Sequence, residues 1–71
     1  MSDELGMKAS RYDVVRAISE ESYKRAMASL AHGDIKQAKE HMDVFEAYDR
    51  RASELKRALY IELEEIKNES L

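Results

Sequence analysis

The sequence contains no cysteine, which excludes disulfide bonds and thiolate metal sites. Proline is also absent and glycine occurs only twice, so few positions can interrupt a helix. No apolar run approaches the roughly 20 residues that a membrane-spanning helix requires, and the first residues lack the basic and apolar segments of a signal peptide. We therefore expect a cytoplasmic protein with no membrane partner.

What remains is a composition typical of amphipathic helices. Hydrophobic residues make up 44% of the 71 residues and charged residues 38%, which favours a folded helical chain over a disordered one. A chain of this length forms only a marginal core by itself. With cross-links excluded, a second subunit is the most available source of further burial, and we expect a homo-oligomer.

A tight turn between two helices is predicted at residues 32–35. Gly33 can adopt the left-handed conformation that ends a helix, and the carboxylate of Asp34 can cap the next one. The predicted helices span about 10–32 and about 34–68, the first beginning at Ser10 with a capping-box-like carboxylate three residues later. The fold class is therefore all-α, an antiparallel two-helix hairpin.

The first nine residues are predicted to form a flexible arm, so that the hairpin itself comprises residues 10–71. Gly6 weakens any helix in this arm by about 1 kcal/mol relative to alanine. An alternative is that the arm folds back, so that Leu5 and Met7 approach the end of the second helix.

Apolar and small residues recur every three or four positions in both predicted helices, as expected for helix faces that pack together. In the first helix the predicted inward residues are Tyr12, Val15, Ile18, Ser22, Ala26 and Leu30. In the second they are Ile35, Ala38, Met42, Phe45, Tyr48, Ala52, Leu55, Leu59, Leu63 and Ile66. The first set is rich in small side chains, which allow close approach but bury little area each.

The two predicted helices differ in length, which predicts an unsheltered end. In an antiparallel hairpin the first helix runs out opposite Lys56, because both helices rise 1.5 Å per residue. Large apolar residues follow that point, and exposed patches of this kind normally mark a contact surface. The predicted oligomer or partner interface is Leu59, Tyr60, Ile61, Leu63 and Ile66. The expected solution is a twofold dimer forming a four-helix bundle, with Tyr60 as the preferred anchor.

The histidines, serines and paired carboxylates of the sequence do not have the spacing of catalytic or metal-binding sites. The only histidines, His32 and His41, lack the carboxylate spacing of a helical metal site. No serine has an evident histidine and acid partner, and neighbouring carboxylates such as Glu64 and Glu65 point in different directions. We expect no catalytic residue, no metal and no cofactor, although a pocket formed between subunits would escape this reasoning.

A basic region supports an alternative function. It consists of Arg50, Arg51, Lys56 and Arg57 in the second helix, and a dimer would double it into a stripe able to contact phosphates. The net charge of −3 opposes that interpretation. The first hypothesis is a non-enzymatic interaction module, such as an adaptor, co-chaperone or inhibitor that docks through a helix face. The alternative is a small nucleic-acid-binding regulator.

The run from Gly33 to Ala38 resembles the inter-helix turn of tetratricopeptide repeats, in which Gly-Asp is followed by an apolar residue and then a small one. The resemblance covers only these six residues. No second repeat follows, and the second helix is too long for that unit, so it implies a similar turn and no shared function.

Overall fold

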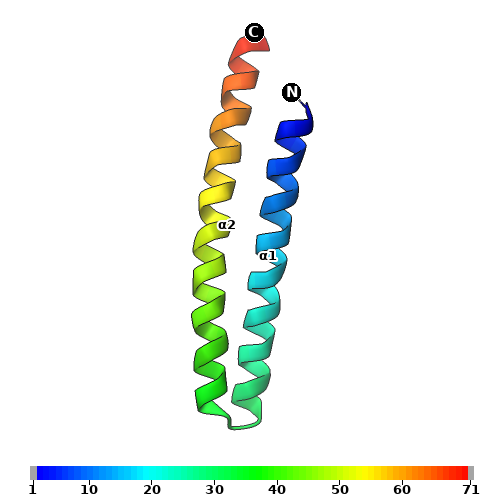
Figure 1. Ribbon diagram of the computed structural model, residues 1–71. Helices are drawn as coiled ribbons and strands as arrows, with labels where there is room; N and C mark the ends of the chain where they lie inside the picture. Colours follow the sequence, from blue (N-terminus) through cyan, green and yellow to red (C-terminus); the bar gives the residue numbers. More distant parts are fainter. Residues whose placement is uncertain (1, 71) are drawn as a thin grey trace.

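The computed structural model describes the backbone of residues 2–70 and the side chains of residues 4–69; Met1 and Leu71, at the ends of the predicted arm and hairpin, lie outside this range. Two helices, α1 (Ser2–Ala31) and α2 (Ile35–Ser70), pack side by side as an antiparallel hairpin (Figure 1). The molecule measures 56 × 16 × 13 Å. The all-α hairpin predicted from the sequence is confirmed. Within residues 2–70, neither helix has the length of apolar sequence that a bilayer crossing needs.

The turn is closed by local backbone chemistry, as its sequence predicts. Gly33 has a φ of 78°, and its amide donates to the Leu30 carbonyl at 3.0 Å while the Asp34 amide donates to the Ser29 carbonyl at 2.8 Å. These two bonds form a Schellman motif, which satisfies the last carbonyls of α1. The Asp34 carboxylate then accepts a 3.1 Å hydrogen bond from the Gln37 amide and caps α2.

The start of α1 differs from the prediction. The helix begins at Ser2 instead of Ser10 and includes most of the segment expected to be an arm. Leu5 is half-buried, and the Lys8 ammonium lies 2.7 Å from the Glu62 carboxylate of α2. These contacts with the other helix compensate for the low helix propensity of Gly6, and helical structure extends through the segment.

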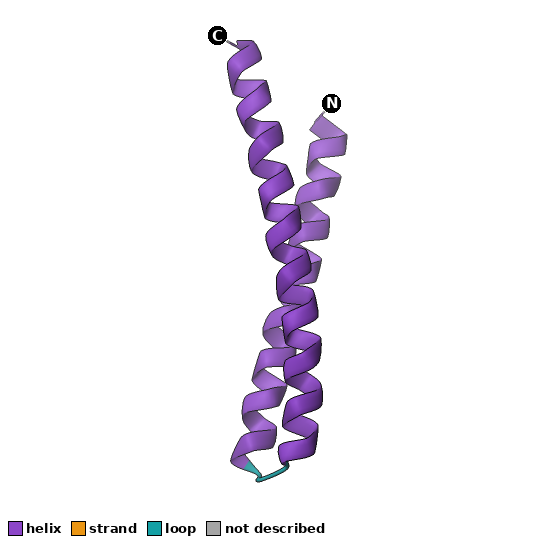
Figure 2. Cartoon of the chain, turned by 90° about the vertical axis from the view of Figure 1, so that its left-hand side faces the viewer, coloured by secondary structure: helices purple, strands orange, loops and turns teal. Residues whose placement is uncertain are grey.

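The line of contact between the helices, here called the seam, repeats every seven residues. In α1 the buried and half-buried residues are Leu5, Lys8, Tyr12, Val15, Ser19, Ser22, Ala26 and Ser29. In α2 they are Ala38, His41, Met42, Phe45, Ala52, Leu55, Leu59 and Glu62. The alternating spacing of three and four in α1 is that of a coiled coil, in which such residues stay on the face towards the partner helix. Figure 2 shows the helices crossing near the middle and diverging towards the termini.

Six large residues predicted to point inward are exposed instead: Ile18 and Leu30 in α1, and Ile35, Tyr48, Leu63 and Ile66 in α2. The two in α1 lie at the edges of the seam. Ile18 is 38% exposed and Leu30 is 46% exposed, whereas the neighbouring Ser19 is buried and Ser29 is half-buried. Two series of residues spaced by seven form the seam in α1. Tyr12, Ser19 and Ala26 make up one, and Val15, Ser22 and Ser29 make up the other. Small side chains in the seam let the two backbones approach closely, and the larger neighbours are displaced to the sides.

The hairpin has no core of large side chains. Among the described residues, the buried ones are all alanine or serine: Ser19, Ser22, Ala26, Ala38 and Ala52. None of the large side chains of residues 4–69 is fully buried. Two helices in one layer can cover only the strip where they touch, so each side of the layer stays open. The buried side chains of the hairpin therefore contribute little apolar area.

Candidate interaction surface

The hairpin has two broad faces, one on each side of the seam. We call the side that carries Tyr23, Phe45 and Lys56 the Tyr23 face, and the side that carries Ile18 and Val44 the Ile18 face. Residues three, four or seven apart share a face of a helix. This rule places the other exposed residues of α1 and α2 on one face or the other. Both faces have exposed apolar residues, and they differ in how these are distributed.

An apolar cluster covers the turn end of the Tyr23 face. The rings of Tyr23 and Phe45 lie 5.4 Å apart at an interplanar angle of 55°, an arrangement typical of favourable aromatic pairs. Met27 and Leu30 follow Tyr23 on the same side of α1, at spacings of four and seven. All three are at least 38% exposed. We call Tyr23, Met27, Leu30, Met42 and Phe45 the turn-end patch.

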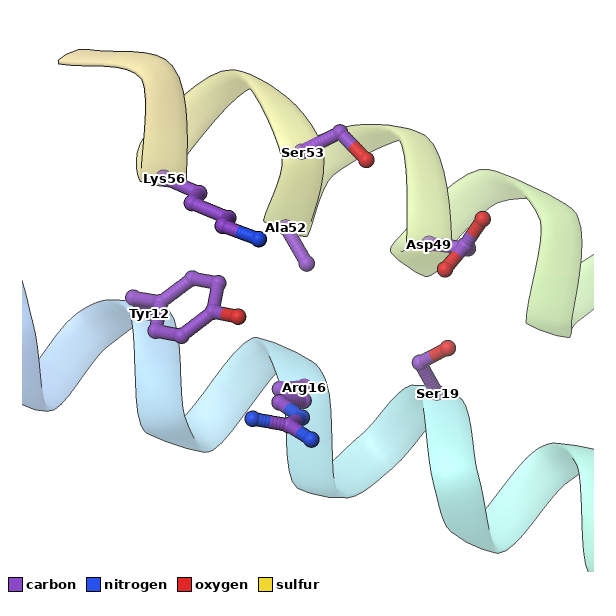
Figure 3. Close-up of a pocket in the computed structure, with 7 residues that line it drawn as sticks. All are labelled: Tyr12, Arg16, Ser19, Asp49, Ala52, Ser53 and Lys56. Atoms are coloured by element: carbon purple, nitrogen blue, oxygen red, sulfur yellow. The ribbon is translucent and has the colours of Figure 1, made fainter. Parts of the chain in front are cut away.

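The middle of the Tyr23 face is polar. A shallow pocket there is lined by Tyr12, Arg16, Ser19, Asp49, Ala52, Ser53 and Lys56, and Figure 3 shows α1 supplying the first three and α2 the rest. Arg16 pairs with Glu20 at 3.2 Å. Within the described part of the chain, neither Asp49 nor Lys56 belongs to an ion pair. The sequence prediction did not single out Asp49, although its seven-residue spacing from Lys56 could have indicated their shared face.

The Ile18 face carries a groove lined by residues of both helices: Ala17, Ile18, Glu21, Ser22, Arg25, His41 and Val44. His41 is half-buried beside the seam. Arg25 pairs with Glu21 along the same helix at 3.4 Å. The large apolar residues that line this groove are Ile18 and Val44, interspersed with charged groups. Val14, four residues before Ile18, is 58% exposed on the same side of α1.

Four of the five predicted interface residues are exposed, Tyr60, Ile61, Leu63 and Ile66, but the predicted reason is wrong. Because α1 reaches Ser2, it accompanies α2 along this segment, and Leu5 lines a pocket with Ile66. Tyr60 is nevertheless 60% exposed and Leu63 is 49% exposed. Their exposure follows from the open sides of a two-helix layer.

These interface residues do not form one surface. Leu59 is half-buried in the seam. Tyr60 and Leu63 are three residues apart and share the Tyr23 face. Ile61 and Ile66 are the other exposed residues of the predicted interface. Adjacent helical residues point about 100° apart, which separates Ile61 from Tyr60. Of the predicted set, Tyr60 and Leu63 therefore remain together as candidates for one contact.

A charged pair lies in the seam near the chain ends. Lys8 Nζ donates to Glu62 Oε1 at 2.7 Å and lies 4.0 Å from Glu4. The hydrogen bond to Glu62 raises the pKa of Lys8, and the nearby carboxylate charges act in the same direction. The other oxygen of Glu62, Oε2, is buried without a hydrogen-bond partner. Sequence reasoning missed this pair because Lys8 and Glu62 are 54 residues apart.

The four predicted nucleic-acid contacts do not line up as a stripe. Arg50 and Arg57, seven residues apart, share the outer side of α2. Arg51 lies seven residues after Val44, towards the Ile18 face, and is 3.7 Å from Glu54. Lys56 lines the pocket on the Tyr23 face. Arranged around the helix, these cations make no common track for a phosphate backbone.

Apart from Lys8, Tyr12, His41 and Glu62, the titratable groups of residues 4–69 are exposed. No group of three metal-ligating side chains suited to an ion occurs among the described residues. Lys39 Nζ lies 2.7 Å from Asp43, and that hydrogen bond raises the pKa of Lys39. Comparison with protein-family models, with curated proteins and with solved structures gave no match.

Proposed function

We propose that the protein is a non-enzymatic interaction module, in which two hairpins associate as a homodimeric four-helix bundle and present a remaining face to a larger protein. One observation supports the proposal above the others. Among the described residues, thirteen large hydrophobic side chains are at least 37% exposed. The residues classed as buried in the same range are alanines and serines. A subunit with this distribution has its apolar area on the outside.

A second subunit would bury more apolar surface than the seam of one hairpin does. Burial of apolar surface stabilises a fold by about 25 cal/mol per Å², and the small seam residues supply little of that surface. A helix pair of this size normally needs cross-links, metal or oligomerisation. Stacking a second hairpin on one face would cover Tyr23, Leu30 and Leu63, whose burial adds apolar area that the seam lacks.

The remaining face would then be available for a larger partner. After one face is covered in the dimer, the other still carries exposed apolar and charged residues on two antiparallel helices. Such a face fits helix docking, in which side chains spaced by three, four and seven residues enter a groove on the partner. The dimer would present two copies of it.

Light scattering coupled to size exclusion tests the first step of this proposal. One chain has a mass of 8.2 kDa, so the proposed dimer has about twice that mass. A dimer mass that persists on dilution into the low micromolar range is the expected result. A folded monomer over the same range contradicts the proposal.

A further inference from the structure

The spacing of charges on α2 indicates how the two copies meet. Four residues of the Tyr23 face follow each other at intervals of seven: Met42, Asp49, Lys56 and Leu63. Their order is apolar, acidic, basic, apolar. Asp49 and Lys56 are exposed on α2 and both line the pocket in Figure 3.

This order is self-complementary when two α2 helices run antiparallel. Each Asp49 then faces Lys56 of the partner subunit, and each Met42 faces Leu63 of the partner subunit. The same register places Phe45 opposite Tyr60 of the partner subunit. A parallel arrangement would place Asp49 against its own copy, and like charges in direct opposition are destabilising.

We propose that the occupant of the Tyr23 face is a second copy of this chain, related by a twofold axis that passes between Ala52 and Ser53 and leaves the two turns at opposite ends. This inference rests on the proposed dimer and specifies its surface and orientation. The turn-end patch of each subunit then covers Tyr60 and Leu63 of the other. A twofold contact of this kind is isologous, so each pair occurs twice.

The area of the Tyr23 face agrees with the area that each partner buries in a stable dimer. A surface 56 Å long and 16 Å wide has a projected area of roughly 900 Å², comparable with the roughly 800 Å² that each partner buries in a standard interface. The apolar residues Met42, Phe45, Tyr60 and Leu63 of α2 lie towards the two ends of this face, and Asp49 and Lys56 of α2 lie near its middle. Along the seven-residue series of α2, antiparallel pairing therefore matches Met42 with Leu63 and Asp49 with Lys56.

The Ile18 face does not offer the same complementarity. Its residues at the corresponding spacing on α2 are Val44, Arg51, Ala58 and Glu65. The antiparallel register that pairs Val44 with Ala58 places Arg51 against its own copy. The register that pairs Arg51 with Glu65 shifts the axis to Ala58 and leaves the turn half of α2 uncovered.

Charge exchange tests the contact. Asp49→Lys and Lys56→Asp, made separately, place like charges together and should each raise the dimer dissociation constant by about tenfold or more, because unpaired and like charges are penalised at an interface. The double variant restores opposite charges and should return the constant to within about threefold of the original. Arg57→Asp is the matched control, with the same charge change one residue away on the outer side of α2, and should leave the constant nearly unchanged. Sedimentation equilibrium measures all four variants.

Distance between the turns tests the orientation. The chain has no cysteine, so Lys36→Cys introduces a single site for a nitroxide label near the turn. This site lies about 16 residues from the proposed axis, and a rise of 1.5 Å per residue predicts about 50 Å between the two labels of a dimer. Spin-label distances measured by pulsed electron resonance provide the readout.

The outcomes separate this inference from the proposed function. A label distance near 50 Å together with rescue in the double charge variant supports it. A dimer with labels closer than about 20 Å has its turns at the same end, and this result overturns the inference while retaining the dimer. Failure of the double variant to recover also overturns it. A monomer by sedimentation overturns both proposals.

Discussion

The turn half and the terminal half of this hairpin are held together in different ways. In the turn half, a left-handed glycine, a Schellman motif and a carboxylate cap close a seam whose buried residues are alanine and serine, with Met42 and Phe45 half-buried beside them. In the terminal half, the seam includes larger side chains and the Lys8–Glu62 pair, and the helices diverge (Figure 2). The comparison shows that local signals specify the turn, whereas the other end depends on contacts between residues far apart in the sequence.

Enlarging a buried alanine in the turn half should have the largest effect on stability. Ala26 is fully buried between the helices, so Ala26→Leu forces the two backbones apart and should lower the free energy of unfolding by about 1–3 kcal/mol. Chemical denaturation at fixed protein concentration measures the change. Ala28→Leu, at an exposed position of the same helix, is the control. An equal loss in the two variants would contradict the close packing of the seam.

The turn itself provides the second test. Gly33 has a positive φ, which costs a residue with a Cβ about 1–2 kcal/mol, so Gly33→Ala should destabilise the hairpin by that amount. No side chain would clash, because an added Cβ meets no atom within 4 Å. Gly33→Asn should recover part of the loss, since asparagine tolerates this conformation better. Thermal and chemical unfolding check the order; alanine as stable as glycine would exclude the backbone explanation.

The terminal half should respond in the opposite direction to the same type of change. Gly6 lies inside α1 with open space around its Cα, and Gly6→Ala should stabilise the protein by about 1 kcal/mol through helix propensity. Ala9→Gly, at an exposed position three residues later, should destabilise it by a similar amount. Backbone hydrogen exchange of residues 2–9 would locate the effect. No gain from Gly6→Ala would indicate that this segment contributes little helix in solution.

The Lys8–Glu62 pair should give the smallest effect and one that depends on pH. Because the pKa of Lys8 is raised in the folded state, its contribution is present below the usual lysine pKa of about 10.4 and is lost as the pH rises through the folded value. The melting temperature of the original protein should therefore fall more between neutral pH and pH 11 than that of Lys8→Met. Parallel falls in the two proteins would show that the pair does not stabilise the fold.

The same division between halves explains which predictions from the sequence held. Gly33 and Asp34 act through bonds to near neighbours, so the turn and the hairpin could be predicted. The start of α1 could not, because the contacts that extend it, such as Lys8 with Glu62, span 54 positions. By its low helix propensity, Gly6 alone indicates that the helix ends nearby. The helix continues through Gly6 because this segment packs against α2.

Hydrophobicity was also a misleading guide to the seam. Ile18 and Leu30 were predicted inside because large apolar residues usually supply the buried area. In this hairpin the positions facing the other helix are Ser19 and Ser29, and the larger residues flank them. Spacing of seven residues was the better signal. The exposure of Tyr60 was predicted, although it results from an open face and not from an unaccompanied helix end.

The central claim is that most of the apolar burial that stabilises this fold occurs between two chains. Thermal unfolding measured at several protein concentrations tests it most directly, because dissociation accompanies unfolding of such a dimer and mass action raises its melting temperature with concentration. We predict a melting temperature that rises steadily from the low micromolar to the high micromolar range. A cooperative transition at the same temperature across that range, in a protein that sediments as a monomer, would contradict the account.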